Sequence, residues 1–214
     1  MKYVVPSVDL NFNQTQLVKK IRSSKDIGLF GVKGVGKTTI LSMIGFIRWY
    51  FNDVDVYSNI PLSYPYYFIE SLEDFDEICV DGRNKIFIGD DFDYWFESRG
   101  YSSKVNKQLN EILMFFGKKS TSLVYSAKRE MAIDKSLRES TVEFWELELC
   151  QRVVHPDPVK NRLLKQYMNF LFVLVNRYDR NLAELPSYRI QNLHQICQLF
   201  DTRHMISKIN NPTT

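Results

Sequence analysis

Eight consecutive residues carry the clearest chemistry in this sequence. Positions 31–38 read GVKGVGKT, which satisfies the pattern G-x-x-x-x-G-K-[ST]. Glycines let a backbone come close to an anion, so successive N–H groups and the start of a following helix can surround phosphate groups. We therefore predict a nucleotide-binding loop formed by Gly31, Val32, Lys33, Gly34, Val35, Gly36, Lys37, Thr38 and Thr39.

Several side chains of this loop have predicted roles. Lys37 would bring a mobile positive charge to the β- and γ-phosphates of ATP, and the Thr38 hydroxyl would join the coordination of Mg²⁺. Thr39 would help to hold the α-phosphate. Lys33 lies within the loop but outside the fixed positions of the motif, so a solvated lysine and a phosphate contact both stay open. The motif thus predicts ATP and Mg²⁺ as cofactors.

A pair of aspartates follows a short apolar segment. Asp90 and Asp91 come directly after residues 86–89, and ligands of open α/β sheets bind at the carboxyl ends of the strands. We expect Asp90 to hold Mg²⁺, directly or through water, and Asp91 to orient and deprotonate the attacking water. Since adjacent strand residues point to opposite sides, Asp91 should not duplicate Asp90. The alternative, that the pair merely starts a loop, stays open because Asp93 is close by.

The elements that must position these residues alternate along the chain. The predicted strands are apolar on both faces, and the predicted helices repeat apolar residues every three to four positions. Helices are expected over 15–23, 40–51, 72–79, 105–116 and 190–200, and strands over 27–30, 54–60, 86–89, 122–125, 141–154 and 168–177. This alternation predicts an α/β fold, a three-layer P-loop NTPase with a mainly parallel central sheet.

A second polar strand end favours one class of this fold. Residues 126–128 follow the strand predicted over 122–125, after another helix. In P-loop ATPases with an additional strand between the loop strand and the acidic strand, a polar residue at this point senses the γ-phosphate. We therefore predict the additional-strand class, with Ser126 and Lys128 as candidate sensors, over nucleotide kinases and small GTPases.

Length and composition agree with one folded unit. The chain has 214 residues, of which 44% are hydrophobic and 25% charged, so a single domain over 1–214 is expected and disorder is disfavoured. Its core would span about 25–140, with accessory strands and a C-terminal helix in 141–214. Three widely spaced cysteines suggest neither a zinc site nor disulfides. No segment has signal-peptide or membrane-helix character, so a cytoplasmic location without an integral membrane segment is expected.

Short motifs beyond the loop point to one branch of these ATPases. They lie at 58–62 (SNIPL), around Asp90 with Trp95 and Ser98-Arg99, at 125–128 (YSAK), at 133–138 (IDKSLR) and at 200–202 (FDT). Together with the loop they resemble the zonular-occludens-toxin-type and viral genome-packaging branch of the FtsK/HerA ATPases. The resemblance covers about 27–140, with a weaker similarity to about 205.

This resemblance implies an ATP-hydrolysing DNA translocase. It implies a homo-oligomeric ring, a pentamer or hexamer, that moves double-stranded DNA into a virus capsid. A capsid or membrane-associated viral protein would be a partner, and the host cytoplasm or the virion would be the location. Three rivals stay open: a phage-assembly ATPase of the zonular-occludens-toxin type, a nucleotide-gated interaction protein, and a kinase of the P-loop class.

The chain departs from the branch pattern at two chemical positions. The branch usually has Asp-Glu where this chain has Asp90-Asp91, so the base would be one methylene shorter. It usually has Gln at the sensor position where Lys128 aligns, so either a charged sensor takes over or Ser126 takes that role.

The arginine finger, which would reach the γ-phosphate of a neighbouring subunit, is a third departure. An Arg-Lys pair commonly precedes the sensor strand, but residues 117–119 read GKK. Arg99 and Arg138 are the candidates, and each could instead be a surface ion-pair partner. Several basic residues could contact DNA without reading its bases, but a solvated face is the favoured interpretation of each cluster. They lie at Lys104, Lys107, Lys118, Lys119, Lys128, Arg129, Lys160, Arg162 and Lys165.

Overall fold

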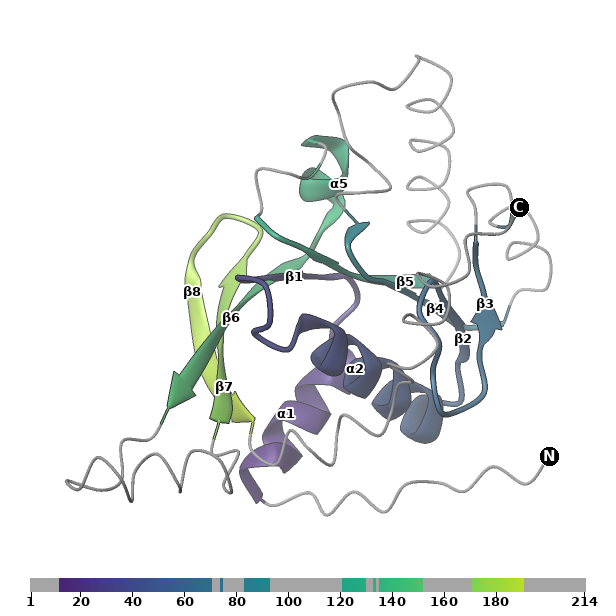
Figure 1. The fold of residues 1–214 in the computed structure, drawn as a ribbon, viewed down its shortest axis with the longest axis horizontal. Coiled ribbons are helices and arrows are strands. Elements are labelled where there is room, and N and C mark those ends of the chain that lie inside the picture. The colour runs from purple at the N-terminus through teal and green to yellow at the C-terminus, as the bar shows by residue number, and fades with distance from the viewer. Residues whose placement is uncertain are drawn as a thin grey trace.

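One sheet organises the structure (Figure 1). The computed structural model of the chain describes residues 12–70, 74, 83–92, 121–129, 133, 135–151 and 171–190. In these ranges eight strands pair in the order β3-β2-β4-β5-β1-β6-β7-β8. Their bounds are β1 Ile27–Phe30, β2 Asp55–Ser58, β3 Tyr67–Phe68, β4 Lys85–Gly89, β5 Thr121–Ala127, β6 Glu143–Gln151, β7 Leu171–Asp179 and β8 Glu184–Ile190.

The strand order confirms the predicted class of fold. Strand β5 lies between β1 and β4 and pairs in parallel with both, so an additional strand separates the loop strand from the acidic strand. Strand β6 continues the parallel sheet on the other side of β1, whereas β7 pairs antiparallel with both β6 and β8. The sheet is therefore mainly parallel, with an antiparallel extension at one edge.

Helices pack on both faces of the sheet. Helices α1 (Phe12–Ser23) and α2 (Lys37–Asn52) lie together on one face (Figure 1), where Ile21, Ile40 and Ile44 belong to the larger core. The short helix α5 (Lys135–Ser140) contributes Leu137 to a second core. Cover on both faces leaves every residue of β1, β4 and β5 buried, and it explains why β1 and β4 are mostly apolar. No helix in the described ranges has the length and apolar content to span a membrane.

Several predicted elements differ from the structure. Ile190 was predicted to start a helix but is the last residue of β8, and residues 191–200 lie outside the described ranges. The sequence does not predict strand β8, because this strand contains Pro186, is largely exposed and lies at the end of the sheet. Helix α5 and strand β3 are too short for a periodic pattern. The helix expected over 105–116, and nearly all of that over 72–79, lie outside the described residues.

A buried carboxylate ties the antiparallel extension to α1. Glu143, at the start of β6, is 4% exposed and forms ion pairs with Lys20 of α1 and Arg177 of β7, the latter over 2.8 Å. The indole of Trp145 donates to the same carboxylate over 3.1 Å. The Arg177 guanidinium also lies over the ring of Tyr188 on β8. One acidic side chain thus holds α1, β6 and β7 together.

Candidate functional site

The loop after β1 has the backbone shape of a phosphate cradle. Gly34 and Gly36 have φ angles of 82° and 100°, which are left-handed conformations that glycine adopts without strain. Val35 between them is 1% exposed, so its side chain anchors the loop in the core, whereas Val32 is 75% exposed. Helix α2 begins at Lys37, directly after the left-handed turn. The free N–H groups at its N-terminus therefore face the loop, as an anion site requires.

Lys37 lies inside this loop. Its ammonium donates to the carbonyl oxygen of Gly31 over 2.8 Å and to that of Val32 over 3.4 Å, and the residue is 9% exposed. Thr39 is buried in the first turn of α2, and Lys33 is exposed. The structure therefore places the Lys37 charge at the centre of the cradle and leaves the Lys33 side chain on the solvent side.

Three segments meet at Asp90. The Thr38 hydroxyl of α2 donates to Asp90 Oδ2 over 2.6 Å, and the Ser126 hydroxyl of β5 donates to Asp90 Oδ1. Asp90 is 8% exposed, and burial raises its pKa above the ordinary value of 3.8, although the bonds from Ser126 and Thr38 act in the opposite direction. The Asp90 carboxylate, predicted from the sequence to follow a buried strand, thus lies in direct contact with Thr38 at the end of the loop.

The oxygens of Thr38 and Asp90 fit a bound Mg²⁺. This cation prefers oxygen ligands, and it usually takes one or two from protein side chains and the rest from waters and substrate phosphates. A threonine hydroxyl and a carboxylate that lie 2.6 Å apart beside the loop supply such a pair. Mg²⁺ would replace the hydroxyl proton as the partner of the carboxylate.

Asp91 differs from Asp90 in exposure, and it lies in a turn after the strand and not on the strand itself. Strand β4 ends at Gly89, and Asp91 has a φ of 46° in the turn that follows. Its side chain is exposed, and its backbone N–H donates to Ser126 Oγ over 3.0 Å. Of the two neighbouring aspartates, Asp90 is therefore buried beside Thr38, and Asp91 is exposed to solvent.

One residue in contact with Asp90 was not identified by chemical reasoning on the sequence. Asn59, just after β2, donates to the carbonyl oxygen of Asp90 over 2.9 Å and accepts from the Asp90 N–H over 2.8 Å. Its only signal in the sequence is membership in the SNIPL motif at 58–62. A polar residue that ends a strand beside the acidic strand is the pattern that could have identified it.

Of the remaining candidates, only Ser126 contacts the two aspartates in the part of the chain that the structure describes. Ser126 is the residue of the β5 end that bonds both aspartates, whereas Lys128 is exposed two residues farther on. Arg138 lies on α5, which packs through Leu137 against the core on the sheet face opposite α2. Arg99 lies outside the described residues, as do Trp95, Ser98 and most of the basic residues considered for DNA contact.

Comparison with solved structures gives the same fold. The N-terminal domain of zonular occludens toxin from Neisseria meningitidis superposes with a TM-score of 0.55 at 15% identity, covering 84% of this chain and 100% of that one. The genome packaging NTPase B204 from Sulfolobus turreted icosahedral virus 2, in complex with AMPPCP, superposes with a TM-score of 0.51 at 11% identity, covering 78% of this chain and 98% of that one. The expected resemblance is thereby confirmed at the level of the P-loop NTPase fold.

No protein-family model and no curated protein sequence matches the chain.

Proposed function

We propose that the protein is an ATP-hydrolysing DNA translocase that packages double-stranded DNA into a virus capsid. The observation that carries the hydrolytic part is the meeting of Thr38, Asp90 and Ser126, which brings the loop helix, the acidic strand end and the β5 end to one point. The similarity to B204, a genome packaging NTPase, supports the DNA part. The 214 residues act as one domain in this proposal.

Binding uses the cradle. The backbone N–H groups of residues 31–38 surround the triphosphate, and Lys37 exchanges its bonds to the loop carbonyls for bonds to the β- and γ-phosphates. Thr39 holds the α-phosphate side, and Lys33 lies at the solvent edge of the loop. Thr38 and Asp90 would hold Mg²⁺, which would supply charge neutralisation for the phosphates.

Hydrolysis uses the turn after β4. Asp91 orients a water molecule and accepts its proton while the water oxygen bonds to the γ-phosphorus. The bond between the γ-phosphorus and the β–γ bridging oxygen breaks, and ADP leaves with the electron pair. Ser126, which bonds both aspartates, couples the position of the γ-phosphate to the acidic turn, and Lys128 is the second sensor candidate.

The motor part of the proposal requires neighbouring subunits. In a homo-oligomeric ring, a pentamer or hexamer, Arg99 or Arg138 of one subunit would reach the γ-phosphate of the next, and such a finger raises turnover by about 10³- to 10⁵-fold. Basic side chains facing a central pore would contact DNA phosphates without reading sequence. A capsid or membrane-associated viral protein would be the docking partner, in the host cytoplasm or in the virion.

The direct test measures phosphate release from ATP with and without double-stranded DNA. Stimulation by DNA, together with rings in negative-stain images with a slowly hydrolysed nucleotide, supports the translocase. Lys37→Ala is the control that should abolish both binding and turnover. Transfer of phosphate to an acceptor would identify a kinase, and binding without turnover would identify a nucleotide-gated interaction protein.

A phage-assembly ATPase is the second candidate. The similarity to the zonular occludens toxin domain, at a TM-score of 0.55, is the observation that favours it. The two candidates share the hydrolytic site and differ in the partner. ATP turnover that does not respond to DNA but responds to membrane-associated viral protein would select this candidate.

A further inference from the structure

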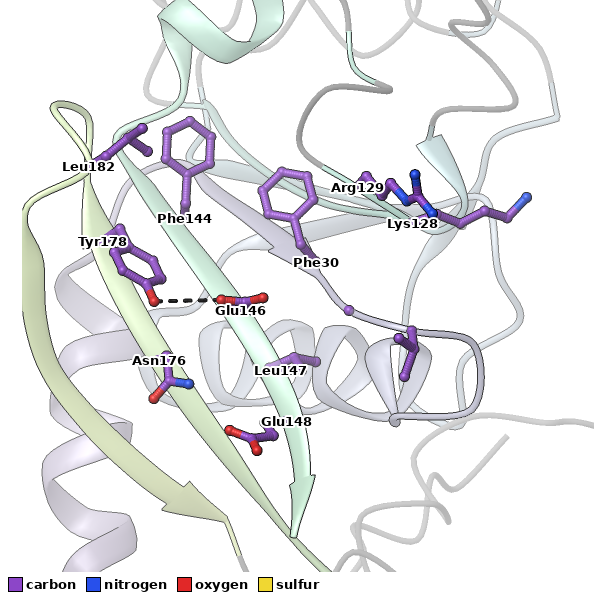
Figure 2. A pocket seen from close by; sticks show the side chains of 12 residues that line it. Phe30, Lys128, Arg129, Phe144, Glu146, Leu147, Glu148, Asn176, Tyr178 and Leu182 are labelled. Atoms are coloured by element: carbon purple, nitrogen blue, oxygen red, sulfur yellow. Dashed lines mark hydrogen bonds between the residues drawn. The ribbon is translucent and has the colours of Figure 1, made fainter.

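A cavity of about 660 Å³ adjoins the cradle on the sheet face opposite α2 (Figure 2). Gly31 and Val32, which begin the loop, form part of its wall. The rest of the wall comes from the end of β5 and from the strands β6 and β7. The cavity is therefore continuous with the start of the proposed phosphate site and has the volume of a ligand pocket.

The charged groups of this cavity are separated along its length. Lys128 and Arg129 line it beside the end of β5, whereas Glu146 and Glu148 line it on β6 (Figure 2). The four formal charges sum to zero, so the cavity as a whole attracts neither an anion nor a cation. It instead has a positive end and a negative end, which suits an elongated ligand with phosphates at one end and hydroxyl donors at the other.

The β6–β7 end combines aromatic and hydrogen-bonding side chains. The pairing of the two strands sets Phe144 opposite Tyr178 and Glu146 opposite Asn176. The Tyr178 hydroxyl donates to Glu146 Oε2 over 3.5 Å, and Figure 2 shows this bond along the cavity wall. A ring face, an amide and a carboxylate within two adjacent residue pairs are the groups that recognise a base and a ribose.

The strand order sets the direction in which a nucleotide must lie. Asp90 follows β4 and Ser126 lies at the end of β5, so the γ-phosphate that they would serve belongs on the β4–β5 side of the loop. The sheet order continues from β5 to β1, β6 and β7. A triphosphate that crosses the loop after β1 therefore directs its nucleoside toward β6 and β7, which is the end of the cavity that carries Tyr178 and Asn176.

We propose that this cavity binds the nucleoside part of the substrate, an assignment that rests on the proposed nucleotide-hydrolysing function. The ribose hydroxyls donate to Glu146 and Glu148, the base lies against the Tyr178 ring, and Asn176 contacts the base edge. Lys128 and Arg129 lie at the phosphate end. The cradle thus supplies phosphate affinity, and the β6–β7 extension supplies discrimination for a nucleoside.

The test compares two probes by titration calorimetry in the presence of Mg²⁺: AMPPCP, which has a nucleoside, and inorganic tripolyphosphate, which has none. Glu146→Gln and Asn176→Ala should each weaken AMPPCP binding by about three- to tenfold, the effect of losing one hydrogen bond, and should leave tripolyphosphate binding unchanged. Glu139→Gln and Asn181→Ala, both outside the cavity lining, are the matched controls and should change neither. Unchanged tripolyphosphate binding also shows that each variant is folded.

The two probes distinguish failure of the nucleoside assignment from failure of the proposed function. If AMPPCP binding is the same in the cavity variants as in the wild type, or if both probes weaken together, the nucleoside assignment is wrong while the hydrolytic function stands. If the wild type binds neither probe, the proposed function itself fails. Photo-crosslinking with an 8-azido-adenine nucleotide gives an independent reading: labelled peptides within 143–151 or 171–182 support the assignment, and labels confined to other segments overturn it.

Discussion

Asn59 and Asp90 exchange two hydrogen bonds across the ends of β2 and β4. The Asn59 side-chain amide donates to the Asp90 carbonyl oxygen over 2.9 Å, and its side-chain oxygen accepts from the Asp90 N–H over 2.8 Å. The Asn59 N–H also donates to the carbonyl oxygen of Ile88 over 3.3 Å. The Asn59 side chain therefore extends the pairing of β2 and β4 by one residue. It fixes the backbone of Asp90, whose carboxylate accepts a hydrogen bond from Thr38.

Asn59→Ala should lower both stability and turnover, because Asn59 holds the backbone of Asp90. The substitution leaves the N–H and carbonyl of Asp90 without their partner, which should lower the free energy of unfolding by about 1–3 kcal/mol. The rate of ATP hydrolysis should fall because the Asp90 carboxylate is less well fixed. Urea unfolding and steady-state turnover measure the two effects, and Asn84→Ala, at an exposed asparagine before β4, is the control. Equal turnover in the two variants would remove Asn59 from the positioning role.

Asp91→Asn should separate turnover from binding. The amide keeps the size of the side chain and tolerates the left-handed turn, but it cannot accept a proton from water. Turnover should fall by about 10²- to 10⁴-fold, while AMPPCP binding stays within about twofold. Asp53→Asn, at another exposed aspartate with positive φ, is the control for the conformational effect of the same change. It should leave both turnover and AMPPCP binding unchanged. Retained turnover in Asp91→Asn would exclude Asp91 as the base.

Ser126→Ala should move the pH dependence of metal-assisted binding. Burial raises the pKa of Asp90, and the Ser126 hydroxyl counteracts this by bonding the ionised carboxylate. Without the hydroxyl the pKa of Asp90 rises further, so the ionised form that binds Mg²⁺ is lost at a higher pH. Affinity for AMPPCP with Mg²⁺, followed from neutral to acidic pH, should therefore fall earlier in the variant than in wild type. Ser122→Ala on the same strand is the control, and coincident pH profiles would contradict the expectation.

Glu143→Gln should show a pH-dependent loss of stability. Burial raises the pKa of Glu143, but bonds from Lys20, Trp145 and Arg177 outweigh burial and hold the pKa below the ordinary 4.5. The folded-state pKa is thus depressed, so the stabilisation is complete above about pH 4.5 and is lost as pH falls below that value. At neutral pH the variant should be less stable by about 3–5 kcal/mol, because Arg177 is buried without its carboxylate.

The check is urea unfolding of both proteins at neutral and acidic pH. The difference in unfolding free energy between wild type and Glu143→Gln should narrow once the pH falls below 4.5. Glu148→Gln, an exposed position on the same strand, should show no such difference. If the difference in unfolding free energy between the two proteins were the same at all pH values, the ionised Glu143 carboxylate would not be the source of the stability.

Gly45→Ala in α2 sets two effects against each other. Alanine is favoured over glycine within a helix by about 1 kcal/mol, but the added methyl would overlap the Tyr64 hydroxyl, which donates to the Ser42 carbonyl over 2.9 Å. Overpacking of this kind costs about 1–3 kcal/mol, so the variant should be destabilised. In a Tyr64→Phe background, which removes the clashing oxygen, the penalty should shrink. Thermal unfolding of the four proteins measures this coupling, and additive effects would show that the two side chains do not conflict.

The loop and the acidic strand end could be predicted because their signals are local. Three glycines, a lysine and a threonine at fixed spacing specify a turn between a strand and a helix, and both elements have periodic apolar patterns. The strand before Asp90 is buried on both faces, and its residues 86–89 carry no polar side chain. Local backbone preference and burial therefore suffice to place Lys37, Thr38 and Asp90.

The edge of the sheet could not be predicted, because strand preference depends on neighbours. Strand β8 contains Pro186 and is mostly exposed, so it forms only because β7 offers its hydrogen-bonding edge. Ile190 consequently ends a strand where its own apolar neighbours suggested a helix.

By itself, the sequence determined the additional-strand P-loop fold and the glycine-rich turn between β1 and α2, because turn chemistry and apolar periodicity act over a few neighbouring residues. Only the tertiary structure decided which polar residues surround Asp90. Asn59 and Ser126 lie 31 and 36 positions from it along the chain, and β-sheet pairing alone brings them within hydrogen-bonding distance. The left-handed turn at Asp91 was decided in the same way, since its N–H is held by the hydroxyl of Ser126.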